Sequence, residues 1–226
     1  MNSPMELDFS DEPAEVESPY VECEFEQRTP EWDLDRLGIP TGTGYAKIIT
    51  TTGKPSTQAG DYMNQLLADW LAGENVSGYA DFFDKNEDIK NGREFEPEAC
   101  ERYEFITDFK VIKRNFCFKN ANKETGVSPD GDIDGHNGGV EIKCVKGKTL
   151  VKYKLDDKVP TAYFQQMQGQ MWVMGWEWCD FFAYHPKVGN FKKRMMRDDK
   201  FIAELAKAVE SFNYLMKEKR EILGDR

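Results

Sequence analysis

Hydrophobic residues recur at helical spacing in three long stretches of the chain and alternate at strand spacing in four others. The helical spacing predicts helices over residues 57–72, over 161–175 and from 198 toward the end. The strand spacing predicts strands at 109–118, 139–145, 177–184 and 191–196. Helices thus precede, separate and follow the strands, and this order predicts a mixed α/β fold.

Shorter signals complete this outline. Thr at a cap position followed by Pro starts a helix over residues 29–38, and the glycine-rich residues 41–44 predict a turn into a short helix. The polar residues 75–88 predict a loop. Residues 90–106 predict a helix, in which Pro97 indicates a kink or a late start because proline disfavours helical geometry in the residue before it.

Length and composition fit one globular domain. The chain has 226 residues, of which 39% are hydrophobic, and it contains neither a membrane-length apolar run nor a secretion-signal pattern at its acidic start. We therefore expect no membrane association and a cytoplasmic location. Five cysteines without a CxxC pair and two histidines argue against a disulfide framework and a zinc site. Any metal would be held mainly by carboxylates, as Mg²⁺ is.

The negative charge is concentrated at the start of the chain. Residues 1–27 contain nine acids and no Lys or Arg, so this segment carries −9 of the net −11. We predict that residues 1–27 form a disordered acidic arm and that residues 28–226 form a single domain. Lysines gather within residues 143–154, so the overall acidity does not exclude nucleic-acid binding.

Two short motifs carry the candidate catalytic residues: Ser128-Pro-Asp130-Gly and Val140-Glu141-Ile142-Lys143. Strand alternation points Glu141 and Lys143 to one face and Ile142 to the other. A hairpin would bring Asp130 to Glu141, and two carboxylates with the Ile142 backbone carbonyl would offer oxygen ligands to Mg²⁺. Lys143 would then orient a water, as metal-assisted phosphodiester hydrolysis requires.

Two other interpretations use the same residues. The acids Asp130, Asp132, Asp134 and Glu141, with Gly135 between them, match the spacing of an EF-hand calcium loop. An EF-hand needs helices on both sides, whereas Pro129 precedes this loop and a strand pattern follows it. The third interpretation is an acidic hairpin turn that binds no metal.

Several sequence motifs together resemble those of the phage lambda exonuclease group of viral recombination nucleases, the YqaJ-like recombinases, which have the PD-(D/E)XK fold. These motifs are Arg36-Leu-Gly-Ile-Pro-Thr41-Gly-Thr43, Gly92-Arg-Glu-Phe-Glu96, the two motifs around Asp130 and Glu141, and Tyr163-Phe-Gln-Gln166-Met-Gln168-Gly-Gln-Met-Trp172. The resemblance implies a restriction-endonuclease-like core, with a mixed central sheet flanked by helices. It also implies a Mg²⁺-dependent 5′→3′ exonuclease that acts on linear double-stranded DNA ends, releases mononucleotides and leaves 3′ single strands for recombination by strand annealing.

The resemblance further implies two Mg²⁺ ions, for which Mn²⁺ is an expected substitute, a homotrimer and a single-strand annealing protein as partner. By position, Asp130, Glu141 and the Ile142 carbonyl would hold metal with help from Glu96, while Lys143 and Gln166 would complete the catalytic set. Arg36 and Thr43 would bind the DNA 5′-phosphate. The further candidates for DNA contact are Thr41, Lys146, Lys148, Tyr163 and Gln168.

Two alternatives stay open at this point. One is an endonuclease with the same fold, against which Arg36 and Thr43 argue because an endonuclease has no terminal phosphate to hold. The other is a non-catalytic module that binds DNA or calcium. A catalytically dead relative would be expected to lose Asp130, Glu141 or Lys143, and all three are present.

Overall fold

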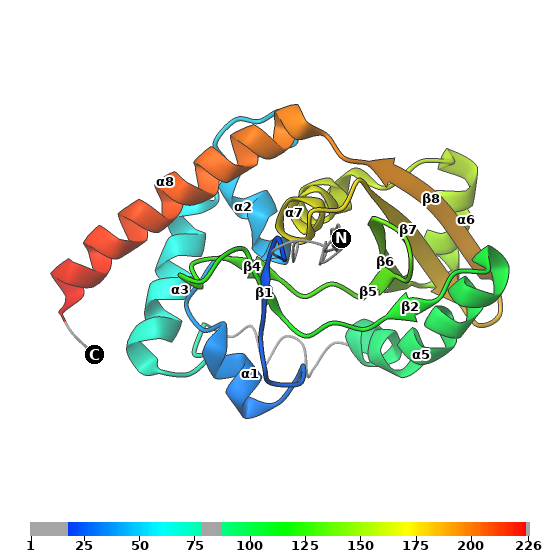
Figure 1. Cartoon of the computed structure of the whole chain (residues 1–226), viewed down its shortest axis with the longest axis horizontal. Helices are drawn as coiled ribbons and strands as arrows, with labels where there is room; N and C mark the ends of the chain where they lie inside the picture. The colour runs from blue at the N-terminus through cyan, green and yellow to red at the C-terminus, as the bar shows by residue number, and fades with distance from the viewer. Residues whose placement is uncertain (1–17, 78–86, 225–226) are drawn as a thin grey trace, which may run out of the picture.

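A five-stranded mixed sheet lies in the right half of Figure 1 in the computed structural model, which describes residues 18–77 and 87–224. Its strands, in spatial order, are β2 (Val111–Ile112), β5 (Gly131–Ile133), β6 (Gly138–Cys144), β7 (Trp178–His185) and β8 (Gly189–Met196). β6 and β7 are parallel, and every other neighbouring pair is antiparallel. The predicted α/β class and the mixed sheet are therefore confirmed.

Two helices cover opposite faces of this sheet. Helix α5 (Glu87–Thr107) contributes Ala99 and Tyr103 to a buried cluster that includes Val140 and Ile142 of β6. Helix α7 (Phe164–Met174) packs on the other face, toward which Glu141 of β6 points. The alternation of β6 thus sends its aliphatic residues to α5 and its charged residues to α7, as the sequence predicts.

A helical layer extends the core beyond α7. It consists of α1 (Pro30–Asp35), η1 (Gly42–Gly44), α2 (Tyr45–Ile48), α3 (Ala59–Ala72) and the long α8 (Asp199–Leu223), which leads away from the sheet to the C-terminus (Figure 1). Helices α2 and α7 meet closely because Gly169 leaves room for the Tyr45 ring, which would lie 2.4 Å from an added Cβ. This contact places η1 and α7 side by side next to the sheet.

The stretch 109–118 is not one strand, and that prediction is wrong. Residues 111–112 pair with β5 in the main sheet, whereas β3 (Cys117–Phe118) joins a separate sheet with β1 (Val21–Glu22) and β4 (Gly126–Val127). The chain leaves the main sheet at Arg114, whose guanidinium reaches Asp132 at 2.5 Å and Glu22 at 3.5 Å. Two ion pairs therefore fix the crossing between the sheets.

Part of the acidic segment, which the charge pattern predicts to be disordered as far as residue 27, is folded. Val21–Glu22 forms β1, and Cys23 is buried with Trp32 and Phe116 in a small cluster. The Asn115 N–H also donates to Glu22 at 2.7 Å, so this acid has a structural partner. From residue 18 the segment belongs to the folded body, while residues 1–17 lie outside the described residues.

Two further differences concern helices. Helix α6 (Gly147–Asp156) and the following turn η2 (Thr161–Tyr163) occupy a stretch for which the sequence pattern gives no helix before residue 161. Helix α5 begins at Glu87 and continues through Pro97, so the expected late start at Pro97 is wrong. Of the predicted loop 75–88, residues 78–86 lie outside the described part of the chain, and α5 begins at residue 87.

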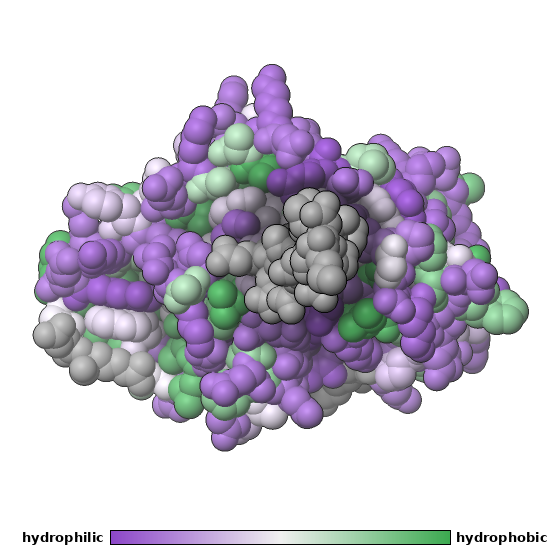
Figure 2. Space-filling view, in the orientation of Figure 1, coloured by the Kyte–Doolittle hydropathy of each residue, from purple (hydrophilic) through white to green (hydrophobic). Residues whose placement is uncertain are grey.

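The face shown in Figure 2 is mostly hydrophilic around the grey atoms, and its hydrophobic side chains are scattered rather than gathered in one patch. Among the residues that the structure describes, no helix is both long and apolar enough to cross a bilayer.

Asp180 on β7 provides a test of this architecture. Its fully buried carboxylate accepts two hydrogen bonds from Arg194, at 2.8 and 3.0 Å, and one from Tyr103 at 2.9 Å. Despite burial, which raises it, the pKa of Asp180 lies below its ordinary value because Arg194, Lys192 and Tyr103 stabilise the charged form. We expect Asp180→Leu to lower the free energy of unfolding by about 3–5 kcal/mol, since it leaves Arg194 without its partner.

The pH dependence of unfolding tests the cause of that loss. A depressed pKa in the folded state adds stability above the unfolded value of about 3.9, and this stability is lost as pH falls below it. The difference between wild type and Asp180→Asn in urea unfolding should therefore shrink below about pH 4. A difference that stays constant from pH 7 to pH 3 would contradict an ionic role for Asp180.

Candidate active site

A β-hairpin brings the two central acids together. Strands β5 and β6 pair with Gly131 opposite Val140, so Asp130 lies next to Glu141 at the edge of the pairing. The Ile142 N–H donates to Asp130 Oδ2 at 2.7 Å, which fixes that carboxylate against β6. Gly131 permits the close approach of β2, because an added Cβ would lie 2.2 Å from Val111 Cγ1. The hairpin predicted from the sequence is present.

Glu141 is almost completely buried and is held by three donors. Gln166 Nε2 and Lys143 Nζ reach its Oε1 at 2.7 and 2.5 Å, and Gln170 Nε2 reaches its Oε2 at 2.5 Å. A buried carboxylate is tolerated only when its oxygens are paired in this way. Gln170 is the functional residue that sequence reasoning missed. Its position one helical turn after Gln166 was the available signal, since residues i and i+4 share a helix face.

The charges of this cluster act on each other. Burial, followed by the nearby Glu141 carboxylate, raises the pKa of Asp130 to about 8. Burial alone would lower the pKa of Lys143, but Glu141 and Asp130 more than reverse this and keep the ammonium protonated. The site therefore contains the protonated Lys143 ammonium beside two carboxylates that repel each other, and this arrangement favours the binding of a further cation.

Glu96 approaches this cluster from α5. Its negative charge is the smallest of those that raise the pKa of Asp130, so Glu96 lies within electrostatic reach of that carboxyl. Glu96 Oε2 also pairs with Arg28 at 2.9 Å. Arg28 has φ +75°, a left-handed conformation that is uncommon for a non-glycine residue. This partner could not be predicted from local sequence patterns, because 68 residues separate Arg28 and Glu96.

The donor set fits a hard divalent ion at Asp130 and Glu141. A carboxylate has about four lone-pair positions, of which the contacts above use three on Glu141 and one on Asp130. The backbone of Ile142 lies at the same place, and its carbonyl remains a predicted ligand. Within residues 18–77 and 87–224, however, no three His, Cys, Asp or Glu side chains are grouped closely enough to hold a metal by themselves.

The calcium-loop interpretation does not fit this geometry. Asp132 Oδ2 pairs with Arg114 at 2.5 Å, and its Oδ1 accepts from Trp176 Nε1 at 2.7 Å. Both carboxylate oxygens are thus committed to the packing of the sheet. The flanking segments are strands rather than the helices of an EF-hand.

Of the residues expected at a DNA end, Thr41 and Thr43 lie at η1, which packs against α7, whereas Arg36 lies at the end of α1. Gly42 of η1 leaves room for Gln166, whose Cγ would be 4.0 Å from an added Cβ, so exposed Thr43 lies on the flank of the cluster that Gln166 occupies. Thr41 and Thr43 hydroxyls are 3.5 Å apart. Arg36 stacks on Trp32, with its Cζ 3.7 Å from the ring centroid, and pairs with Asp33 at 3.2 Å. Its Nε is buried without a hydrogen-bond partner among the described residues.

The remaining candidates for DNA contact differ in whether their side chains are accessible to DNA. The Tyr163 ring lies 5.5 Å from Lys143 Nζ, and Lys146 and Lys148 are exposed at the start of α6. Gln168 is 1% exposed; it donates to the Met196 carbonyl and accepts from the Asp198 N–H. A contact between Gln168 and DNA is not compatible with this burial, because helical spacing turns it away from the face that carries Gln166.

The mixed sheet and the cluster at its centre define a nuclease of the PD-(D/E)XK type. The profile of the YqaJ-like viral recombinase domain matches residues 31–177, and the chain belongs to that family. No curated protein sequence matches it.

Solved structures agree with this assignment. The chain is similar to LHK-Exo, an alkaline exonuclease from Laribacter hongkongensis, with 30% identity, a TM-score of 0.75, and coverage of 86% of this chain and 96% of that one. LHK-Exo in complex with dAMP gives 31% identity and a TM-score of 0.76, with the same coverage. A phage-related exonuclease from Haemophilus somnus 129PT shares the fold at 16% identity, a TM-score of 0.59, and coverage of 80% and 96%.

Two buried glutamines of α7 give a matched test of the site. We expect Gln170→Met to lower the nuclease rate about 10- to 100-fold, because Glu141 loses a donor that orients it. Gln168→Met removes an amide of equal size that binds only backbone groups, so it should lower the unfolding temperature but not the rate per folded molecule. Rates normalised to folded protein, with unfolding followed by circular dichroism, would check this. Equal losses of rate in both variants would contradict the role of Gln170.

Proposed function

We propose that this chain is a Mg²⁺-dependent 5′→3′ exonuclease that acts at the ends of linear double-stranded DNA, releases mononucleotides and leaves 3′ single strands. The observation that carries the proposal is the cluster of Asp130, Glu141 and Lys143 on one strand edge, completed by Gln166. The neighbour LHK-Exo is an alkaline exonuclease and was crystallised with dAMP, a mononucleotide. Both facts agree with stepwise removal of nucleotides from an end.

The side chains divide the chemistry among them. Asp130, Glu141 and the Ile142 carbonyl would hold Mg²⁺, for which Mn²⁺ is an expected substitute, and Glu96 would help with a second ion. When bound, such an ion polarises the phosphoryl oxygen and supplies a nucleophilic water. Lys143, kept charged by Glu141, would orient the attacking water and offset negative charge on the phosphate. Gln166 and Gln170 would keep the Glu141 carboxylate fixed while the DNA strand advances through the site.

End recognition is proposed for Arg36 and Thr43. A terminal phosphate carries an extra negative charge and offers oxygens to a planar guanidinium and a hydroxyl. The Arg36 Nε is buried without a partner in the described structure, so it is not satisfied by the present packing. Arg36 would have to turn from Asp33 to offer Nε and Nη2 to a phosphate, and that exposed pair is weak enough to be exchanged.

The assembly and partner of the enzyme are part of the same proposal. We propose that three copies surround the DNA and that a single-strand annealing protein coats the exposed 3′ strand. Lys146 and Lys148 at the start of α6 would then add positive charge near the DNA path. Under this proposal the enzyme would act in phage-type recombination, and we propose the cytoplasm as its location.

A single assay tests the activity. The substrate is a linear duplex with a 5′-phosphate and a label on one strand, and closed circular DNA is the companion. We expect stepwise shortening from the 5′ end with Mg²⁺, none with Ca²⁺, and no cutting of the circle. Lys143→Met should lower the rate by about 10²- to 10³-fold, the usual cost of removing one donor that stabilises developing negative charge.

A comparison of 5′-phosphate with 5′-hydroxyl ends tests the role of Arg36. Wild type should prefer the phosphate, and Arg36→Ala should reduce that preference about tenfold or more, as the loss of a charged hydrogen bond predicts. Lys207→Ala is the control, because Lys207 is an exposed cation on α8. Cutting of the circle would replace this proposal with an endonuclease, and DNA binding without any cleavage would replace it with a clamp.

A further inference from the structure

Three buried side-chain nitrogens have no hydrogen-bond partner among the described residues, and all three border one short segment of the chain. They are Trp32 Nε1, Arg36 Nε and Arg220 Nε. Trp32 and Arg36 belong to the segment 32–38 itself. Arg220 reaches it from the end of α8, where its Nη2 donates to the Gly38 carbonyl at 2.6 Å. Buried polar groups are normally paired, so this concentration of unpaired donors marks the segment as a candidate for function.

Arg220 is a partly buried cation whose contacts join α8 to α3 and to the segment 32–38. Its guanidinium carbon lies 5.1 Å from the centroid of the Trp70 ring on α3, and burial lowers its pKa. Its hydrogen bond to the Gly38 carbonyl spans 182 residues of sequence. The last turn of α8 is thus tied to the start of the chain by one charged hydrogen bond and one cation–π contact.

Gly38 shows how closely this segment is enclosed. Its φ is +71°, a left-handed conformation that favours glycine, and an added Cβ would lie 2.8 Å from Trp70 Cβ and 3.2 Å from the Leu66 carbonyl oxygen. The same added atom would lie 3.3 Å from Arg220 Nη2. Gly38 is therefore held between α3 and the end of α8, and Arg220 is the α8 side chain that closes this enclosure.

Arg36, two residues before Gly38, depends on this enclosure for its position. It ends α1, stacks on Trp32 and shares an exposed ion pair with Asp33. When Arg36 turns from Asp33 toward a phosphate, that ion pair is lost, and the enclosed backbone at Gly38 then keeps the residue in place. Charge-assisted hydrogen bonds from a guanidinium form at about 2.7–2.9 Å, so even a small shift of this backbone would weaken them.

We propose that Arg220 is a positioning residue for recognition of the DNA end. It holds the segment that ends at Gly38 in the geometry in which Arg36 distinguishes a 5′-phosphate from a 5′-hydroxyl. This inference rests on the proposed exonuclease function and adds to it a determinant of specificity near the C-terminus. The helix that carries Arg220 would then do more than extend the core as it leads away from the sheet (Figure 1).

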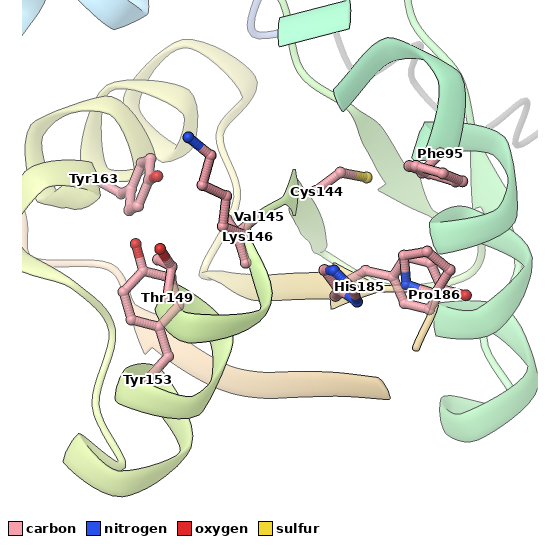
Figure 3. Close-up of a pocket in the computed structure, with 10 residues that line it drawn as sticks. Phe95, Cys144, Val145, Lys146, Thr149, Tyr153, Tyr163, His185 and Pro186 are labelled. Atoms are coloured by element: carbon pink, nitrogen blue, oxygen red, sulfur yellow. The ribbon is translucent and has the colours of Figure 1, made fainter. Parts of the chain in front are cut away.

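Arg220 is separate from the catalytic cluster. Its contacts are to α3 and to the residue that follows α1 and Leu37. The cavity beside the cluster, shown in Figure 3, is lined by other elements, among them α5 and α6. A change at Arg220 should therefore affect the choice of DNA end and leave the chemistry at Lys143 unaltered.

The ratio of kcat/KM for 5′-phosphorylated and 5′-hydroxyl duplexes tests the proposal, because this ratio does not depend on how much of a variant is folded. Arg220→Met removes the donor to Gly38 near the end of the last helix, where its loss should not prevent folding. The ratio should fall about five- to tenfold, part of the effect of one charged hydrogen bond. Lys219→Met is the matched control, because Lys219 is an exposed cation on the same turn of α8.

A double variant separates positioning from direct contact. If Arg220 acts through Arg36, adding Arg220→Met to Arg36→Ala should change the ratio by less than about twofold. A further fall of the same size would overturn the proposal, because Arg220 would then contact the DNA itself.

The other contrary outcomes are distinct. An unchanged ratio in Arg220→Met would overturn the proposal, as would equal losses on both kinds of end, which indicate a structural role alone. A wild type without preference for the phosphate would overturn it together with end recognition by Arg36. In all these cases linear DNA is still degraded, and the exonuclease function stands. Absence of any degradation by the wild type would count against the function itself.

Discussion

The buried carboxylate of Glu141 is the constraint on which the rest of the site depends. At 1% exposure this charge is unfavourable unless its oxygens find donors. Lys143 supplies one from the same strand, and Gln166 and Gln170 supply two from α7. The same contacts that stabilise the charge also fix α7 against β6. The contacts that orient Glu141 are therefore also contacts that pack the helix on the sheet.

The second constraint is repulsion between the two acids that the hairpin brings together. Asp130 cannot move away, because the Ile142 N–H holds it and the Val111 side chain packs beside Gly131. Burial and the neighbouring Glu141 carboxylate raise the pKa of Asp130 to about 8, so both disfavour its charged form. A cation held between the two carboxylates would relieve their repulsion, as the proposed metal site requires.

Most of the secondary structure around the site could be predicted from the sequence, because it follows from local hydrophobic periodicity and short motifs. The helix expected at 161–175 appears as α7, and the strand expected at 139–145 as β6, with Glu141 and Lys143 on one face. What could not be predicted depends on distant contacts. The stretch 109–118 reads as one strand, but Arg114 binds acids from both sheets and divides it. Helix α6 has a single fully buried residue, Leu150, so its apolar stripe is too weak to stand out among lysines.

Crystals of the full chain soaked in Mn²⁺, with the ion located by its anomalous scattering, would test the central claim most directly. The account predicts an anomalous peak bonded to a carboxylate oxygen of Asp130 and to one of Glu141, and its disappearance in Glu141→Gln. A peak at Asp132 and Asp134 instead, or an unchanged peak in Glu141→Gln, would contradict the claim that the carboxylate held by Lys143, Gln166 and Gln170 is the metal ligand.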